Sequence, residues 1–280
     1  MEVVQYCNPQ EFADIIEPLL MEKEAANNLP LGIIDRLVKG TFKQDEVFMY
    51  VIKEKGEPVY MTMRTPPHLW ILPDVPSLKI EHIEALTHHF WKRSLEVPGV
   101  IGEEQGIQWF LDSWKSLTGQ EAELQMHQAV YQLDTLLAKP EGNGNLVTAA
   151  KEHHSLLTGW LVQFEQETGI SLHQEASEVA EQWIEDQRVY LWVVDGEAVS
   201  MAARARTTPH GVTVNGVFTP DEKKRNGYAT RAVWELTDLL LKKGYQFCAL
   251  YTDLSNPTSN AIYKKIGYQW IGNSKVYHFV

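Results

Sequence analysis

The residues with the clearest potential for chemistry lie in the last quarter of the chain. Gly227 stands between a basic run, Lys223-Lys224-Arg225, and a segment with helical periodicity. The first amides of a helix have no partners within it and lie at the positive end of its dipole, so they bind anions. A glycine lets the backbone approach a phosphate closely. These residues favour a site for a phosphate-bearing ligand, with a plain strand-to-helix turn as the alternative.

Two elements must position this loop. The stretch from Val214 to Thr219 has strand character and is interrupted by Gly216. Asn215-Gly216 alone would indicate a hairpin turn, but the residues that follow favour a bulge that frees backbone groups for a ligand. From Ala229 to Lys243, apolar residues recur at the spacing of a helix with one buried face, and Gly244 follows its end. A further strand is expected over Phe247 to Thr252.

This segment resembles the acetyl-CoA motif of the GNAT superfamily. The motif reads Arg/Gln-x-x-Gly-x-Gly/Ala, and here Lys224-Arg225-Asn226-Gly227-Tyr228-Ala229 follows Val217-Phe218-Thr219-Pro220. Lys224 departs from the pattern, because it keeps the charge but lacks the guanidinium fork. A second family segment, Asn-(six residues)-Tyr-x-Lys-x-Gly-Phe/Tyr, matches Asn256 to Tyr268. The resemblance covers about residues 145–280.

The resemblance implies transfer of an acetyl group from acetyl-CoA to a primary amine by direct attack, with no metal. Backbone groups of Val217, Phe218 and Thr219 would hold the pantetheine arm, and an amide there would polarise the thioester carbonyl. Tyr263 would act as general acid for the departing CoA thiolate. Asn256 would contact the cofactor. The residues expected around the pyrophosphate are Lys224, Arg225, Asn226, Gly227, Tyr228, Ala229 and Thr230.

The general base is not visible in the sequence. The strand from Val214 to Thr219 carries no carboxylate, which leaves a water chain, a residue of the first half, or Glu181 or Glu185 as guesses. A non-catalytic acyl-CoA-binding or sensing protein is the alternative function, and Tyr263 argues against it. A structural protein without CoA, disfavoured by the Gly227 loop, and another acyl group, such as succinyl, also stay open.

The two halves of the chain repeat a common order of elements. Apolar runs around a glycine-containing turn predict β-hairpins at 47–66 and 189–207, each preceded by two helical segments and followed by a strand, a helix and a strand. Similar strands, 129–133 and 275–279, close the halves. We expect an α/β protein of two tandem GNAT-like domains, 1–137 and 146–280, joined by a linker at 138–145. Each would be a twisted, mostly antiparallel sheet flanked by helices.

The first domain is expected to have lost its cofactor site. In the place of the phosphate loop, 72–78 has no glycine, and Pro73 and Pro76 remove amide donors that a phosphate would use. A helix from about Leu78 to Ser94 follows. The role of this domain would be structural, or it would form a wall of the acceptor cleft.

The charge pattern bears on the partners. The net charge of −12 argues against nucleic-acid binding, and no apolar stretch is long enough to span a membrane. Residues 223–280 carry +6, which leaves −18 for the remainder and favours a cationic acceptor, either a small molecule or a basic peptide. The first five residues lack the features of a secretory signal, so we expect a cytoplasmic protein, either a monomer or a homodimer.

Several conspicuous residues are interpreted as structural. Cys248 lies in an apolar run and is expected to be a buried hydrophobe, without a disulfide to Cys7. The pairs His88-His89 and His153-His154 lack the convergent ligands of a metal site. Trp160 and Trp183 are more typical of a core, although either one could line the acceptor pocket.

Overall fold

The order of helices and strands is the same in the two halves of the chain. The computed structural model describes residues 1–41, 46–170, 172 and 174–280. The first half comprises β1 (Glu2–Tyr6), α1 (Pro9–Met21), α2 (Asn28–Val38), β2 (Phe48–Glu54), β3 (Glu57–Arg64), β4 (Trp70–Leu72), α3 (Ile80–Lys92), β5 (Gly99–Glu103), α4 (Glu104–Thr118) and β6 (Ala122–Leu133). The second comprises β7 (Asn145–Thr148), α5 (His154–Thr168), α6 (Ala176–Glu185), β8 (Val189–Val194), β9 (Glu197–Thr207), β10 (Gly211–Phe218), α7 (Tyr228–Lys242), β11 (Phe247–Asp253), α8 (Pro257–Ile266) and β12 (Gln269–Phe279).

The elements gather into two compact units. Unit 1 contains Met1–Tyr131, Tyr251–Pro257 and Trp270–Val280, and unit 2 contains Gln132–Leu250 and Thr258–Gln269. Each unit has an α/β architecture in which helices cover a mostly antiparallel sheet, as the sequence predicts.

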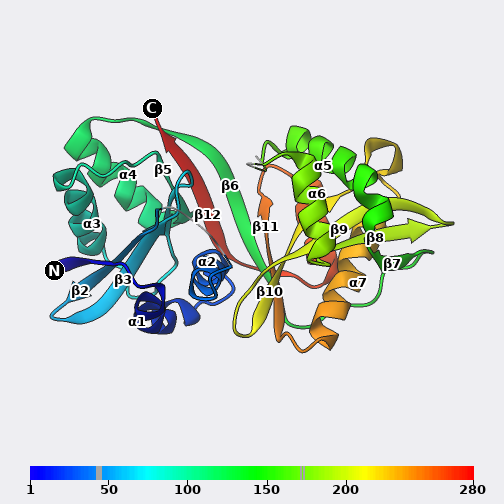
Figure 1. Ribbon diagram of the computed structural model, residues 1–280, viewed down its shortest axis with the longest axis horizontal. Coiled ribbons are helices and arrows are strands. Elements are labelled where there is room, and N and C mark those ends of the chain that lie inside the picture. The colour runs from blue at the N-terminus through cyan, green and yellow to red at the C-terminus, as the bar shows by residue number, and fades with distance from the viewer. Residues whose placement is uncertain (42–45, 171, 173) are drawn as a thin grey trace. The chain divides into compact units, whose positions relative to one another are not determined.

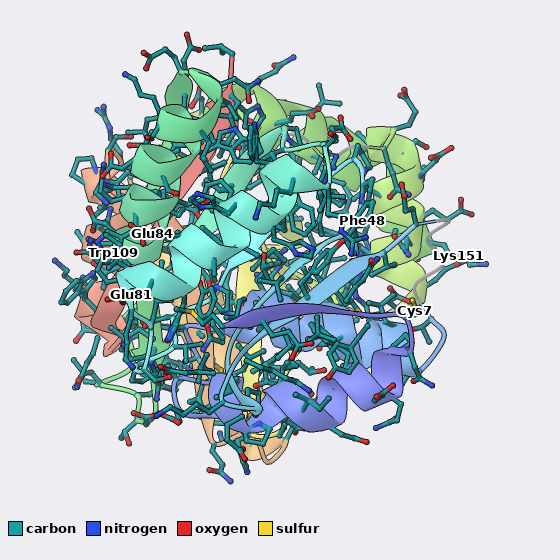
Figure 2. The ribbon with its side chains drawn as sticks, turned by 90° about the vertical axis from the view of Figure 1, so that its left-hand side faces the viewer. Cys7, Phe48, Glu81, Glu84, Trp109 and Lys151 are labelled. Carbon is teal, nitrogen blue, oxygen red and sulfur yellow. The ribbon has the colours of Figure 1, made fainter. Side chains whose placement is uncertain are left out.

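The strands of unit 1 follow the order β1-β2-β3-β4-β5-β12-β6. All pairs with a defined register are antiparallel except β4 with β5. Strand β12 comes from the end of the chain and pairs with β5 from Ser274 opposite Glu103 to His278 opposite Gly99. Helices α3 and α4 lie side by side over this unit, with Glu81 and Glu84 on α3 and Trp109 on α4 (Figure 2). The sequence predicts this closing strand but not the sheet that it joins.

Unit 2 contains the strand order β11-β10-β9-β8-β7, parallel between β10 and β11 and antiparallel elsewhere. Successive side chains of a strand point to opposite faces. Accordingly, Val189 and Leu191 of β8 join one apolar cluster with α5 and α6, whereas Trp192 joins another with Ala232 of α7. Helices α5 and α6 therefore cover one face of the sheet and α7 the other (Figure 1).

The predicted elements around the Gly227 loop are confirmed with small shifts at their ends. Helix α7 begins and ends one residue earlier than its apolar periodicity predicts, and β10 begins three residues before Val214. Within the described part of the chain, no helix has the length and apolar character needed to cross a bilayer.

Candidate functional site

Strand β10 contains a bulge at Gly216. Asn215 lies opposite Ala203 of β9, but Phe218 lies opposite Met201, so β10 has one residue more than its partner across this step. Gly216 has a φ of +56°, and a Cβ on it would lie 2.6 Å from the Trp183 ring of α6. Glycine is therefore required both by the backbone conformation and by the close approach of the ring. The interpretation as a bulge, rather than a hairpin turn, is confirmed.

The pairing of β10 with β11 ends before this bulge. The parallel register joins Gly211, Val212 and Thr213 to 247–249, while β10 continues to Phe218. Ser200 of β9 holds the end of β10, because its hydroxyl donates to the Phe218 carbonyl at 2.9 Å and lies 2.9 Å from the Thr219 hydroxyl. The end of β10 near Phe218 is thus fixed to β9. On the side that faces β11, the residues of β10 after Thr213 have no paired strand residue in the described register.

The loop after β10 leads directly into α7. A short 3-10 turn, Asp221–Lys223, is followed by Arg225 and Gly227 with φ values of +66° and +72°. Gly227 is the N-cap residue and no side chain caps the helix, so the amides of its first turn face outward from the helix end without a side-chain acceptor. Such amides suit an anion.

The lysines of the loop are paired with carboxylates. Lys223 lies 2.7 Å from Glu197, and Lys224 lies 2.9 Å from Glu167 of α5 and 2.6 Å from Asp221. These contacts offset part of the positive charge that the sequence places here. Arg225 is exposed at the same turn. Lys224 therefore anchors the loop to α5 in addition to contributing charge.

Tyr263 lies on the buried face of α8, together with Asn260 and Ile266. Burial raises the pKa of its hydroxyl to about 12, so this group keeps its proton throughout the neutral range. Its ring meets that of Tyr268 edge to face, with 5.9 Å between centroids, and the Tyr268 hydroxyl lies 3.0 Å from that of Thr237 on α7. The two motif segments are thus connected through packed side chains within unit 2.

Comparison with known proteins identifies the architecture. The family model described as "FR47-like protein" matches residues 190–278. Among solved structures, a GNAT-family acetyltransferase from Colwellia psychrerythraea is 14% identical and covers 100% of this chain and 99% of its own, with a TM-score of 0.58. A tandem GNAT protein from the clavulanic acid biosynthesis pathway is 14% identical and covers 100% and 98%, with a TM-score of 0.63. A GCN5-related N-acetyltransferase from Sphaerobacter thermophilus is 14% identical and covers 99% and 95%, with a TM-score of 0.62.

The chain has a tandem GNAT fold. This result confirms the predicted fold class and agrees with the resemblance noted in the sequence. No curated protein sequence matches the chain.

Within this tandem GNAT fold, the predicted site residues divide between the two compact units. Unit 2 contains Tyr263 and the run from Val217 to Thr230, whereas Asn256 belongs to the segment Tyr251–Pro257 of unit 1. The backbone amide of Asn256 donates to the Asp253 carbonyl at 3.1 Å. Glu181 and Glu185 lie exposed on α6.

The conspicuous tryptophans and Cys248 belong to the core. Trp160 and Trp183 are buried in the cluster that contains Phe218, and Trp160 approaches the Phe218 ring at 6.1 Å. Cys248 is buried, and this burial raises the pKa of its thiol to about 12. The interpretation of Cys248 as a small buried hydrophobe is confirmed. Cys7 is exposed and free.

The histidine pairs bind protein groups. His88 contacts the Glu84 carbonyl at 2.8 Å, His153 accepts the Ala150 amide at 3.0 Å, and His154 contacts the Ser177 carbonyl at 3.0 Å. The ring of His89 packs against Tyr50. Among the residues that the structure describes, no group of three or more potential metal ligands occurs.

Sequence reasoning did not single out Arg231, which lies beside the Gly227 loop. Its guanidinium donates to the Asn226 carbonyl at 2.7 Å and to the Glu141 carbonyl of the linker at 2.8 Å. One signal was available, because a cation in the first turns of a helix is disfavoured by the helix dipole and calls for a specific partner. Ser200 was also missed, and nothing in its local pattern distinguishes it from an ordinary strand residue.

Proposed function

We propose that this protein is an N-acetyltransferase that moves an acetyl group from acetyl-CoA to a primary amine. The observation that carries the proposal is the combination of the Gly216 bulge with the Gly227 helix start. The bulge and the early end of the β10–β11 pairing leave strand backbone available beside the loop. Ten residues after Phe218, the last residue of β10, the uncapped first turn of α7 begins at Tyr228.

The pantetheine arm and the pyrophosphate of acetyl-CoA each have matching groups in this proposal. Backbone groups of Val217, Phe218 and Thr219 would pair with the amides of the pantetheine arm. The pyrophosphate needs donors and positive charge. The outward amides from Arg225 to Thr230 would bind it, and the side chain of Lys224 would add positive charge beside them. Asn256 would add a polar contact to the cofactor.

The chemistry requires a polarised carbonyl and a proton for the leaving group. A free amine would attack the thioester carbon, and a β10 amide would stabilise the oxyanion that forms. As the carbon–sulfur bond breaks, Tyr263 would protonate the CoA thiolate. The raised pKa of this buried hydroxyl supports the assignment, because the group remains a proton donor at neutral pH.

The acceptor is proposed to be a cationic amine. The chain outside residues 223–280 carries a net charge of −18, and such a field attracts cations. The amine must lose a proton before it attacks, and the base for this step is not assigned. Higher kcat/KM for polyamines or basic peptides than for neutral amines, with the preference falling as salt rises, is the expected result. Equal turnover that does not respond to salt would reject a charge-selected acceptor.

We propose that unit 1 does not bind acetyl-CoA. At the end of β4, the Asn27 side chain accepts the Asp74 amide at 2.9 Å and donates to the Asp74 carbonyl at 2.9 Å. The chain's own carboxamide thus occupies the backbone groups that follow the strand. The adjoining cavity has a volume of about 40 Å³, enough for a few water molecules. One cofactor per chain is the expected stoichiometry.

Calorimetry with acetyl-CoA tests the proposal directly. Wild-type protein is expected to bind one equivalent with micromolar affinity, and Gly227→Glu to lose it, because the substitution places a carboxylate at the proposed phosphate loop. Gly196→Glu is the matched control, since Gly196 also has a positive φ (+82°) but nothing within 4 Å of a Cβ. If folded wild-type protein binds no acyl-CoA, the proposal fails. Binding without turnover on any amine would favour a sensing protein.

A further inference from the structure

The linker between the two halves is attached to helix α7. Trp234 of α7 donates its indole N–H to the Leu137 carbonyl at 3.0 Å, and Lys139 forms an ion pair with Glu235. The Leu137 amide donates to the Ile266 carbonyl of α8 at 3.0 Å. All of these residues lie in unit 2. The linker and the preceding Leu137 are therefore packed against α7, the helix that follows the Gly227 loop.

Arg231 connects this linker to the Gly227 loop. It is the fourth residue of α7, and side chains on a helix lean toward the helix N-terminus, so its guanidinium reaches back to the loop. One Nη donates to the Glu141 carbonyl and the other to the Asn226 carbonyl. The Tyr228 ring lies 5.2 Å from the guanidinium carbon. The guanidinium thus contacts the linker, the Gly227 loop and the ring of Tyr228, each on a different side.

The hydrogen bond to Asn226 fixes the direction of a neighbouring amide. A trans peptide is planar, and its C=O and N–H point in opposite directions. When the Asn226 carbonyl points at Arg231, the amide of Gly227 in the same peptide unit must point away from Arg231. That amide is one of the donors proposed for the pyrophosphate.

Gly142 of the linker lies against the guanidinium of Arg231. This glycine has a φ of +134°, and a Cβ on it would lie 2.4 Å from Nη1 and 2.6 Å from the central carbon of Arg231. The guanidinium therefore lies flat against the backbone of Gly142. The Arg231 Nε is buried without a hydrogen-bond partner, so the arrangement is determined by the two Nη contacts and by packing.

We infer that Arg231, held by the linker residues Glu141 and Gly142, is a positioning residue that orients the Gly227 amide for the cofactor. This inference rests on the proposed acetyl-CoA site. Its consequence is that the linker contributes to cofactor affinity without contacting the cofactor.

Two variants test this role in the full-length chain. Arg231→Gln removes the guanidinium with its two Nη donors. Gly142→Ala keeps the arginine but pushes its guanidinium out of its present position. Each is expected to weaken acetyl-CoA binding about tenfold, the order expected when a charge-assisted contact is disturbed. The double variant is expected to be no weaker than either single one, because both act through one contact. Gly244→Ala is the control, with a positive φ (+103°) and open space around a Cβ.

The amide resonance of Gly227 provides a readout that a general loss of stability would not change. In ¹⁵N-labelled wild-type protein, acetyl-CoA is expected to shift this resonance strongly, and in both variants at saturating ligand the shift is expected to be much smaller. If both variants bind like wild type with the same shift, the inference is overturned while the proposed function stands. Weaker binding with an unchanged Gly227 shift also overturns it. If wild-type protein binds no acetyl-CoA, the proposed function itself fails.

Discussion

At the scale of single residues, Tyr263 is the group on which catalysis depends in the proposed reaction. Tyr263→Phe removes the hydroxyl but keeps the ring, which packs against Tyr268. We expect kcat to fall by about 10²–10⁴-fold, the usual contribution of a positioned proton donor, with little change in acetyl-CoA affinity. Steady-state kinetics and calorimetry check both parts. An unchanged kcat would remove Tyr263 from the chemical step.

The same hydroxyl makes a prediction about stability at alkaline pH. Its pKa is about 12 in the folded protein, against about 10 when exposed in the unfolded chain. The unfolded state therefore loses this proton first, and the contribution to stability, complete below pH 10, is lost as the pH rises toward 12. The loss amounts to about 2 kcal/mol at pH 12.

Urea unfolding of wild-type protein and Tyr263→Phe between pH 9 and about pH 12 checks this expectation. The wild-type protein should lose more stability over this range than the variant, because the variant has no phenol to ionise at this position. The buried Tyr60 of unit 1 contributes equally to both proteins and cancels in the comparison. The pKa of Tyr268 is raised in part by Tyr263, so its contribution falls together with that of Tyr263 in the variant. Parallel pH profiles would contradict the assigned shift.

At the scale of elements, Gly216 determines the shape of β10. Gly216→Ala would place a methyl group 2.6 Å from the Trp183 ring and would force a residue with a Cβ into the left-handed region. We expect a loss of about 2–4 kcal/mol in unfolding free energy, since backbone strain and overpacking add. Denaturant unfolding checks the value. Gly196→Ala, which has the positive φ without the contact, should lose only the strain component, and an equal loss would show that packing on Trp183 contributes nothing.

The sequence predicts these elements because their signals are local. The apolar run of β8, the apolar stripe of α7 and the position of Gly216 are all contained in short windows, and the structure confirms the strand, the helix and the bulge. The contacts that complete the loop are not local. Lys224 pairs with Glu167, and Arg231 pairs with the Glu141 carbonyl 90 residues earlier, so no spacing rule connects them. The family motif predicts the site residues, but only the structure shows which contacts hold them.

At the scale of the whole molecule, the chain's end completes the sheet of unit 1. Strand β12 lies between β5 and β6 in the strand order, and Lys275 forms an ion pair with Glu104 at 2.6 Å. The sequence shows that residues 275–279 form a strand but not which sheet accepts it, because periodicity specifies the faces of a strand and not its neighbours. The stability of unit 1 therefore depends on residues 270–280, far along the chain from its other strands.

Deleting residues 275–280 tests this dependence. The deletion removes four of the five β12 positions in register with β5, so the amides at 99–103 should lose protection from hydrogen exchange. Amides at 197–207 of unit 2, which pair with β8 and β10, should keep theirs. Removing Val280 alone is the control, since it lies outside β12. Unchanged protection at 99–103 would show that unit 1 is stable without its last strand, and equal loss in both units would show that the two unfold together.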